Sequence, residues 1–165
     1  MKPRAVLIGP PAAGKSRLGK RIAQRLGVPF VDTDKVVVSH HGPIPEIFAT
    51  HGETQFREWE RDAVIDALHT DGIVSLGGGA ILNEDTQRDL VDHNVLLITA
   101  SPEAIEHRLS AGTRPLLTDG IESWKALVAG RQPIYDRLAR HTVDTSHGTM
   151  DSIADEVADD LRNAA

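Results

Sequence analysis

Short hydrophobic runs alternate along the chain with longer amphipathic stretches. The runs are bounded by polar residues or glycine, as in strands buried within a sheet. The longer stretches carry apolar residues three and four positions apart, which predicts helices with one buried face. We predict strands at residues 5–8, 28–31, 72–76, 95–98 and 143–144. We predict helices at residues 14–26, 53–69, 84–91, 121–138 and 149–163, a helix opening at 101–103, and short helices within 35–50. Alternating strands and helices indicate an α/β sandwich with a central parallel sheet.

The first predicted strand leads into Gly9-Pro10-Pro11-Ala12-Ala13-Gly14-Lys15-Ser16, which fits the phosphate-binding loop (P-loop) pattern G-x-x-x-x-G-K-[ST]. Such a loop folds its backbone N–H groups around an anionic phosphate. Lys15 reaches the outer phosphates, and the Ser16 hydroxyl can ligate Mg²⁺. The following helix adds the partial positive charge of its N-terminus. The order of strand, loop and helix favours this interpretation over an ordinary glycine-rich turn.

An acidic pair, Asp32 and Asp34, follows the second predicted strand. In an extended chain, residues i and i+2 point to the same side. The two carboxylates would then lie together beside the phosphate loop, at the strand ends where parallel sheets bind ligands. Aspartates after a strand are also common turn formers. The neighbouring phosphate loop favours the functional interpretation.

Three further segments contain residues that could take part in ligand binding or catalysis. The run Gly77-Gly78-Gly79-Ala80 after the third predicted strand is either a flexible turn or a place where backbone approaches a ligand. Arg131 continues the apolar face of the helix at 121–138, so it needs a partner or a ligand anion. The stretch from Ser110 to Pro115 is small and polar, carries Arg114, and predicts a mobile loop.

Composition narrows the class of protein. The 165 residues suit one domain with a full core, and the net charge of −6 without a basic block argues against a nucleic-acid partner. The absence of cysteine excludes disulfides, thiolate metal sites and thiol catalysis. The eight histidines show no metal-ligand spacing, and no apolar run approaches the ~18 residues that a membrane span needs. Because the N-terminus leads straight into a strand, we expect no signal peptide and a cytoplasmic protein. A chain this small has no second domain for a macromolecular substrate, so we expect a small-molecule substrate. We also expect a monomer.

Taken together, these motifs resemble shikimate kinase. They occur in that family's order and cover nearly the whole chain: Gly9–Ser16, Asp32–Asp34, Gly52–Glu60, Gly77–Ala80, Arg114–Leu117 and Arg131–Tyr135. The resemblance implies a single P-loop domain over residues 1–165, a three-layer sandwich of the nucleoside-monophosphate-kinase-like type with a five-stranded parallel sheet. It implies phosphorylation of the 3-hydroxyl of shikimate by ATP and Mg²⁺, within aromatic amino-acid biosynthesis.

The resemblance also implies roles for residues of the nucleotide site. Ser16 and Asp32 would hold Mg²⁺, Asp32 through water. Lys15 and Arg114 would act on the transferring phosphate, and Arg114 would lie on a lid loop at about 110–118. Contacts to ATP would come from Gly9, Ala12, Ala13, Gly14, Lys15, Ser16, Arg17, Arg108 and Arg114.

On the acceptor side, the resemblance implies substrate-binding helices at about 35–68. Asp34 would bind substrate hydroxyls and orient or deprotonate the attacking one. Arg57 and Arg131 would bind the substrate carboxylate, with Gly78 offering its backbone N–H. Glu60, three residues after Arg57, would hold that arginine in place.

The sequence departs from the family pattern in places. Ala12 stands where the family commonly has glycine, and a positive φ there would cost alanine on the order of 1 kcal/mol. Arg17 replaces a frequent threonine, and residues 146–148 match poorly. Two other functions are open: another small-molecule kinase such as a gluconate kinase, which lacks this combination of motifs, and a catalytically weak nucleotide-binding regulator, which only Ala12 favours.

Overall fold

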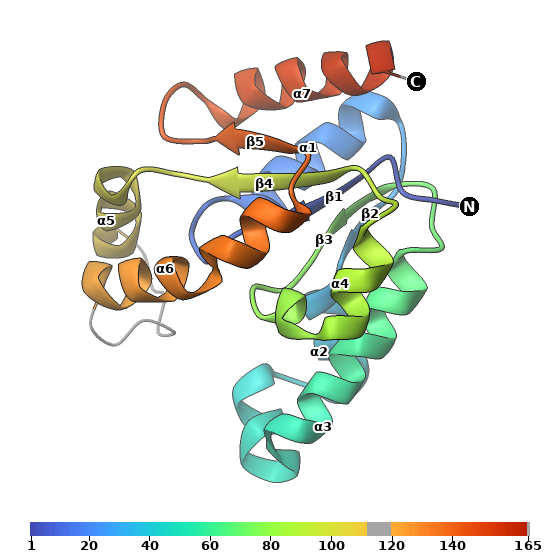
Figure 1. Ribbon diagram of the computed structural model, residues 1–165, viewed down its shortest axis with the longest axis vertical. Coiled ribbons are helices and arrows are strands. Elements are labelled where there is room, and N and C mark those ends of the chain that lie inside the picture. The colour runs from blue at the N-terminus through green and yellow to red at the C-terminus, as the bar shows by residue number, and fades with distance from the viewer. Residues whose placement is uncertain (112–119, 165) are drawn as a thin grey trace.

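The computed structural model describes residues 1–111 and 120–164 (Figure 1). In chain order, the elements are β1 (Ala5–Ile8), α1 (Lys15–Leu26), β2 (Phe30–Asp32), α2 (Thr33–His41), α3 (Ile44–Ala67), β3 (Ile73–Ser75), the 3₁₀ helix η1 (Ala80–Leu82), α4 (Glu84–Leu90), β4 (Val95–Thr99), α5 (Pro102–Ala111), α6 (Ile121–Leu138), β5 (His141–Asp144) and α7 (Met150–Ala164).

The strands form a five-stranded sheet with the order β2-β3-β1-β4-β5, and every neighbouring pair is parallel. Val6 at the centre of β1 is in register with Val74 of β3 and Val95 of β4. Parallel neighbours need crossover connections, and helices supply them here. The predicted sheet and its five strands are therefore confirmed, and β1 is its central strand.

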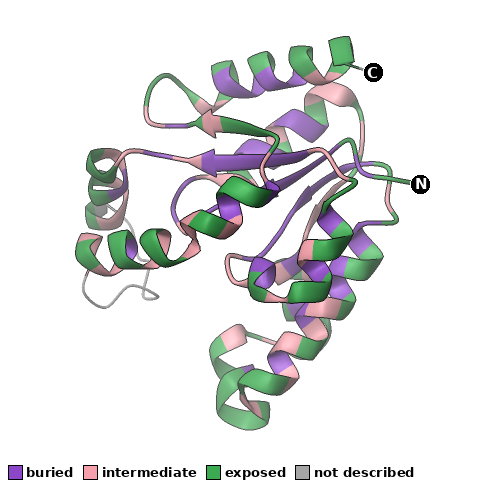
Figure 2. Ribbon diagram, in the orientation of Figure 1, coloured by how far each residue is buried: buried purple, intermediate pink, exposed green. Residues whose placement is uncertain are grey.

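Helices cover both faces of the sheet, which gives the predicted three layers (Figure 1). Alternate residues of β1 point to opposite faces: Leu7 packs in a cluster with α1 and α7, whereas Val6 packs in a cluster with α3, α4 and α6. The inner strands are buried and the outer helix surfaces are exposed (Figure 2). Hydrophobic burial on both faces thus fixes β1, and with it the start of the phosphate loop.

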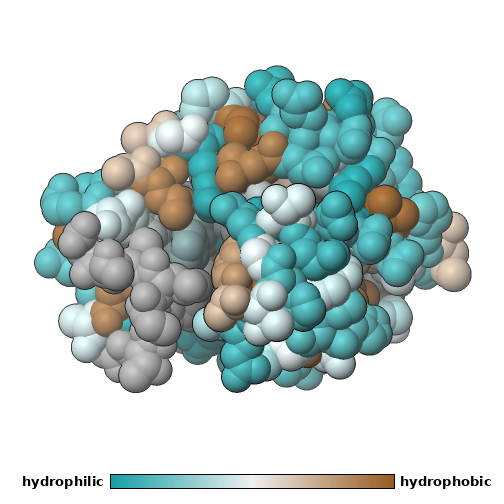
Figure 3. Space-filling view, turned by 90° about the horizontal axis from the view of Figure 1, so that it is seen from below, coloured by the Kyte–Doolittle hydropathy of each residue, from teal (hydrophilic) through white to brown (hydrophobic). Residues whose placement is uncertain are grey.

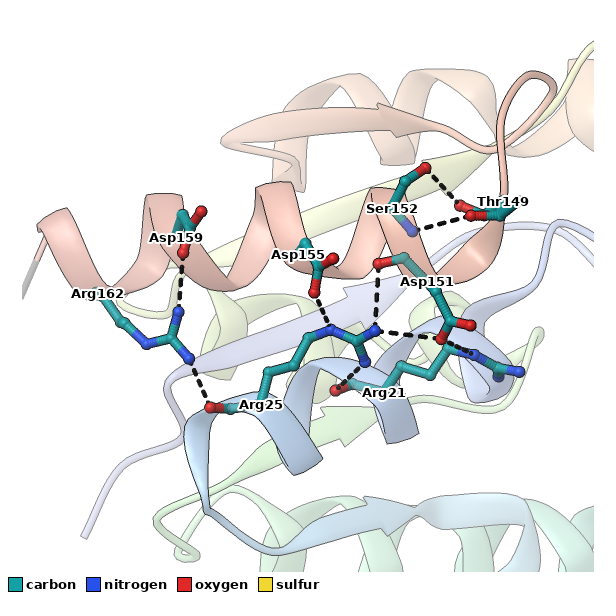
Figure 4. A network of polar contacts seen from close by, with 8 residues as sticks. All are labelled: Arg21, Arg25, Thr149, Asp151, Ser152, Asp155, Asp159 and Arg162. Atoms are coloured by element: carbon teal, nitrogen blue, oxygen red, sulfur yellow. Dashed lines mark hydrogen bonds and ion pairs between the residues drawn. The ribbon is translucent and has the colours of Figure 1, made fainter.

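The first and last helices are joined by a network of charged side chains (Figure 4). Arg25 of α1 pairs with Asp155 of α7 and lies 3.2 Å from Asp151, while Arg21 lies 3.0 Å from Asp151. Arg162 of α7 donates to the Arg25 carbonyl at 2.6 Å. These pairs add to the apolar contacts between α1 and α7 and hold the C-terminal helix beside the phosphate-loop helix.

One local prediction needs correction. The chain is not extended through Asp34, because the strand ends at Asp32 and α2 begins at Thr33. The predicted break at 42–43 is present between α2 and α3. Within α3, Gly52 is not helical, with φ 83° and ψ 169°, so the two halves on either side of this kink match the separate helices that the sequence predicted.

Hydrophobic residues do not form one broad patch on the face of the molecule in Figure 3. The side seen in Figure 3 is mainly hydrophilic, and its hydrophobic residues lie in small separate groups. Among the described residues, no helix combines the length and apolar character that crossing a bilayer requires.

Candidate active site

The phosphate loop connects β1 to α1, and its backbone path favours small residues at three positions. Gly9 has φ 147°, and a Cβ there would lie 2.1 Å from the Ile98 carbonyl oxygen. Gly14 has φ 100° and caps α1. Ala12 has φ 66°, so alanine does occupy the left-handed region, at a cost of about 1 kcal/mol relative to glycine. The expectation of strain at this position is confirmed.

Lys15 opens α1 and folds back over the loop. Its Nζ donates to the carbonyl oxygens of Gly9 at 2.7 Å and Pro10 at 3.1 Å. The ammonium group therefore lies on the inner side of the loop, next to the N-terminus of α1. Both the charge and the helix dipole favour an anion at this place.

Asp32 links the loop to α2 through its two carboxylate oxygens. Oδ2 accepts a hydrogen bond of 2.5 Å from the Ser16 hydroxyl. Oδ1 accepts from the backbone N–H groups of Asp34 at 3.0 Å and Lys35 at 3.3 Å, so Asp32 is the N-cap of α2. The hard oxygen atoms of Ser16 and Asp32 meet at one point, and they are ligands that Mg²⁺ prefers.

Asp34 lies in the first turn of α2, and its carboxylate is largely enclosed. Burial, with the nearby charge of Asp32, raises the pKa of Asp34 above its ordinary value, although Lys15 and Arg57 oppose the shift. A Cβ at Gly77 would lie 2.2 Å from Asp34 Oδ1, so the carboxylate needs a glycine at 77. The Gly77 N–H donates to the buried Thr33 hydroxyl at 3.0 Å, which holds the two segments together.

Arg57 and Glu60 form the predicted pair on α3. Arg57 Nη1 lies 2.8 Å from Glu60 Oε1, and the Glu60 side chain is 5% exposed. Burial raises the pKa of Glu60, while the hydrogen bond from Arg57 acts in the opposite direction. Because a buried carboxylate needs a cation, Glu60 keeps the Arg57 guanidinium at one place. That guanidinium lies against Gly79, where a Cβ would be 2.6 Å from Nη1.

Arg131 of α6 reaches the same glycine run. Its Nη1 donates to the Gly78 carbonyl oxygen at 2.9 Å. The sequence predicted that Arg131 needs a partner, and that partner is the Gly78 carbonyl. The next residue, Gly79, is the one against which the Arg57 guanidinium lies. The glycine run therefore brings two guanidinium groups to consecutive residues.

These side chains face one cavity of about 370 Å³. It brings together most of the residues predicted for the site. The predicted residues among its lining are Ala12, Gly14, Lys15, Ser16, Arg17, Asp32, Asp34, Arg57, Gly78 and Arg131. Within the described chain, no group of three or more His, Asp and Glu residues could by itself hold a metal ion.

Three residues predicted for the nucleotide site lie away from this lining. Gly9 and Ala13 contribute to the loop's backbone, and Arg108 of α5 lies outside the loop. Arg108 Nη1 donates to the Ala12 carbonyl at 2.8 Å, and its Nη2 donates to the Thr145 carbonyl at 2.7 Å. Arg114 and most of the predicted lid at 110–118 are outside the described residues.

Sequence reasoning missed two other residues that contact the loop. Trp124 Nε1 donates to the Pro11 carbonyl at 2.8 Å, and the Thr145 hydroxyl donates to the Ala13 carbonyl at 2.6 Å. The helix predicted at 121–138 contains Trp124, but no contact between this residue and the loop was predicted. The available signal was its indole N–H, which needs an acceptor when the ring is buried.

The phosphate loop follows the central parallel strand, and an acidic pair and two arginines face it across one cavity. This arrangement is that of a P-loop kinase of the nucleoside-monophosphate-kinase-like fold. The shikimate kinase family model matches residues 11–162. With this match over more than nine-tenths of its length, the chain belongs to the shikimate kinase family, and it is a phosphotransferase.

Individual relatives agree with this assignment. The chain is 45% identical to the shikimate kinase of Mycobacterium avium over 151 residues, which cover 88% of this chain and 86% of the relative. The structure of shikimate kinase from Acinetobacter baumannii in complex with shikimate superposes with a TM-score of 0.86 at 26% identity, covering 99% of this chain and 94% of that one. A gluconokinase from Sinorhizobium meliloti, at 18% identity and a TM-score of 0.61 over 98% of this chain and 92% of its own, shares the fold alone.

Proposed function

We propose that this protein transfers the γ-phosphoryl group of ATP to the 3-hydroxyl of shikimate, giving shikimate 3-phosphate and ADP. The observation that carries the proposal is the gathering of Asp34, Arg57 and Arg131 in the cavity that the phosphate loop also lines. This arrangement suits an acceptor that carries both a carboxylate and hydroxyl groups. The shikimate complex of the Acinetobacter relative supports the choice of acceptor.

The nucleotide side follows from the loop. Its inward N–H groups and Lys15 would neutralise the phosphate charge that develops during transfer. Mg²⁺, when bound, would neutralise further charge on the phosphate oxygens. Ser16 and Asp32 would hold it, Asp32 through water, because their oxygens already lie 2.5 Å apart.

On the acceptor side, α2 and α3 would form most of the binding surface. Arg57, kept in place by Glu60, and Arg131 would bind the carboxylate with planar guanidinium forks. The Gly78 N–H would add a donor beside them. Carboxylate binding at these arginines would turn the ring so that one hydroxyl faces Asp34.

In the chemical step, the acceptor oxygen forms a bond to the γ-phosphorus, and the bond from that phosphorus to the β–γ bridging oxygen breaks. The Asp34 carboxylate orients the hydroxyl and accepts its proton as the new phosphate ester forms. The raised pKa of Asp34 brings its proton affinity closer to neutral pH, which suits this role.

A coupled assay of ADP release tests the proposal with shikimate, with gluconate and with no acceptor, each with ATP and Mg²⁺. We expect turnover that depends on shikimate, with the phosphate on the 3-oxygen as read by ³¹P NMR. Turnover that depends on gluconate would assign the gluconate kinase activity instead. A protein that binds ADP but releases none from ATP with either acceptor would be the nucleotide-binding regulator.

A further inference from the structure

Three successive carbonyl groups of the phosphate loop are held from behind by side chains far away in the sequence. We call these side chains the rear donors. They come from α6, from α5 and from the residue after β5, and α5 and α6 lie side by side (Figure 1). The bonds are Trp124 Nε1 to Pro11 O at 2.8 Å, Arg108 Nη1 to Ala12 O at 2.8 Å and Thr145 Oγ1 to Ala13 O at 2.6 Å.

By holding each carbonyl, the rear donors also determine the direction of the N–H group in the same peptide unit. The described residues contain no cis peptide bond, so every carbonyl here is antiparallel to the N–H of the next residue. A carbonyl of Pro11 held outward therefore turns the Ala12 N–H inward, and the Ala13 carbonyl does the same for the Gly14 N–H. The Ala13 N–H is instead donated to the Pro10 carbonyl oxygen at 3.5 Å, within the loop. On that inner side lie Lys15 Nζ and the cavity lining. The rear donors thus aim the N–H groups that would receive phosphate oxygens.

Ala12 makes this support more important. Its φ of 66° is unfavourable for alanine, so a flipped peptide would relieve strain and turn an N–H away from the cavity. The Ala12 side chain is 6% exposed and packs with the Trp124 ring, which is 3% exposed, and with Ile105. Trp124 therefore acts on this part of the loop twice, through packing on Ala12 and through its hydrogen bond to Pro11.

We propose that Trp124 is a positioning residue for the nucleotide phosphates, holding the Pro11–Ala12 peptide with its N–H directed at the bound anion. The identity of that anion rests on the proposed kinase function. Trp124 donates to the loop from behind and is not part of the cavity lining, so we assign it no direct contact with either reactant. We therefore expect Trp124 to affect the affinity for a nucleoside di- or triphosphate and not the affinity for the carboxylate acceptor.

The test is the Trp124→Phe variant, which keeps an aromatic ring and removes the N–H donor. Calorimetry should show binding of ADP weakened about three- to tenfold, the range expected when one hydrogen bond is lost. Inorganic tripolyphosphate, which has no base, should weaken by the same factor. Shikimate binding should stay within about twofold of wild type, and in steady state the KM for ATP should rise more than kcat falls.

Val128→Ala is the matched control. Val128 packs against the same apolar cluster but makes no bond to the loop, so this variant should bind ADP like the wild type. Equal weakening of ADP and shikimate in Trp124→Phe, or the same loss of ADP binding in Val128→Ala, would reduce Trp124 to a packing residue. Unchanged ADP binding, or a loss for ADP that tripolyphosphate does not share, would overturn the proposal as well.

If circular dichroism shows that Trp124→Phe is unfolded, 3-benzothienylalanine at position 124 replaces it, because this analogue keeps the bicyclic shape and lacks the N–H. The binding measurements do not depend on whether the proposed function is correct. A wild-type protein that binds ADP but does not phosphorylate shikimate would refute the function, while the comparison of Trp124 and Val128 would still decide the role of Trp124.

Discussion

Asp32 and Asp34 are two positions apart, yet their carboxylates have different environments. Asp32 has a hydrogen-bond donor on each oxygen, from Ser16 on one side and from the first turn of α2 on the other. Asp34 is half-buried, and the burial of its carboxylate raises its pKa. One carboxylate is thus fixed in place, as the proposed metal site requires, while the other has the environment that the proposed proton acceptor requires.

The Asp34→Asn variant tests the second role. Asparagine keeps the size but removes the charge and the proton acceptor, so the loss should fall mainly on kcat, by at least about a hundredfold, a typical contribution of general base catalysis. The wild-type rate should decline as pH falls through the raised pKa of Asp34, at a higher pH than an ordinary aspartate would give. A variant with wild-type kcat and only a raised KM for shikimate would make Asp34 a binding residue.

The Asp34→Asn substitution should lower kcat but raise the stability of the fold at neutral pH. Because the pKa of Asp34 is higher in the folded than in the unfolded chain, ionised Asp34 destabilises the fold above its folded pKa. This penalty disappears as pH falls to the unfolded value near about 4. Thermal unfolding should therefore show Asp34→Asn more stable than wild type at neutral pH, with the difference shrinking in acid. A difference independent of pH would show that ionisation is not its cause.

At the scale of elements, the glycine run after β3 fits the protein's own charged side chains. Gly77 leaves space for Asp34, and Gly79 leaves space for Arg57. The sequence had left a flexible turn and a close approach to a ligand as alternatives. The structure adds a different reason for these glycines, since two charged side chains of the candidate site pack directly against the backbone there.

Gly79→Ala should therefore displace Arg57 while leaving the fold intact, because the atom in the way is the end of a flexible side chain. A Cβ at 79 would lie 2.6 Å from Arg57 Nη1, whereas a Cβ at Gly78 would lie an ordinary 3.5 Å from Arg131 Nη1. We expect Gly79→Ala to weaken shikimate binding about tenfold, the lower end for a lost charge-assisted contact. Gly78→Ala should have a smaller effect by calorimetry. The reverse order would contradict this assignment.

The elements themselves were largely predictable from the sequence. Apolar runs located the strands, and helical periodicity located the helices, since these signals depend on burial of one local segment. The phosphate loop, the acidic pair and both arginines were also found. Asp34 was placed in an extended chain because no periodicity marks a helix whose cap is the last residue of a strand. The contacts of Trp124 and Thr145 were missed because they join residues 113 and 132 positions away from their partners.

At the scale of the whole molecule, the first and last helices are packed together. α1 and α7 share an apolar cluster, and their charged side chains form the network in Figure 4. The charged pairs are partly exposed, so each contributes little to the stability of the fold. Salt should screen them. The apolar cluster is the larger source of stability.

Arg25→Ala tests this balance, because Arg25 contacts both Asp151 and Asp155. The variant should show a small fall in its urea midpoint at low ionic strength, since two ion pairs are lost. Added sodium chloride, at about 1 M, should remove most of the difference from wild type. Arg162→Ala, which removes the neighbouring contact to the Arg25 carbonyl, serves as a comparison. A large midpoint shift that salt does not change would indicate that the Arg25 stem contributes through packing.

The rear donors also have a consequence for how the chain is made. During translation, the phosphate loop leaves the ribosome among the first residues, but the donor to Ala12 follows 96 residues later, and those to Pro11 and Ala13 follow 113 and 132 residues later. Met150, which lies against Gly14, comes later still. At synthesis rates of roughly 5–20 residues per second, the complete motif is exposed for several seconds before its supports exist. Nascent chains that end before α6 should therefore carry the full nucleotide motif without the ability to retain a nucleotide.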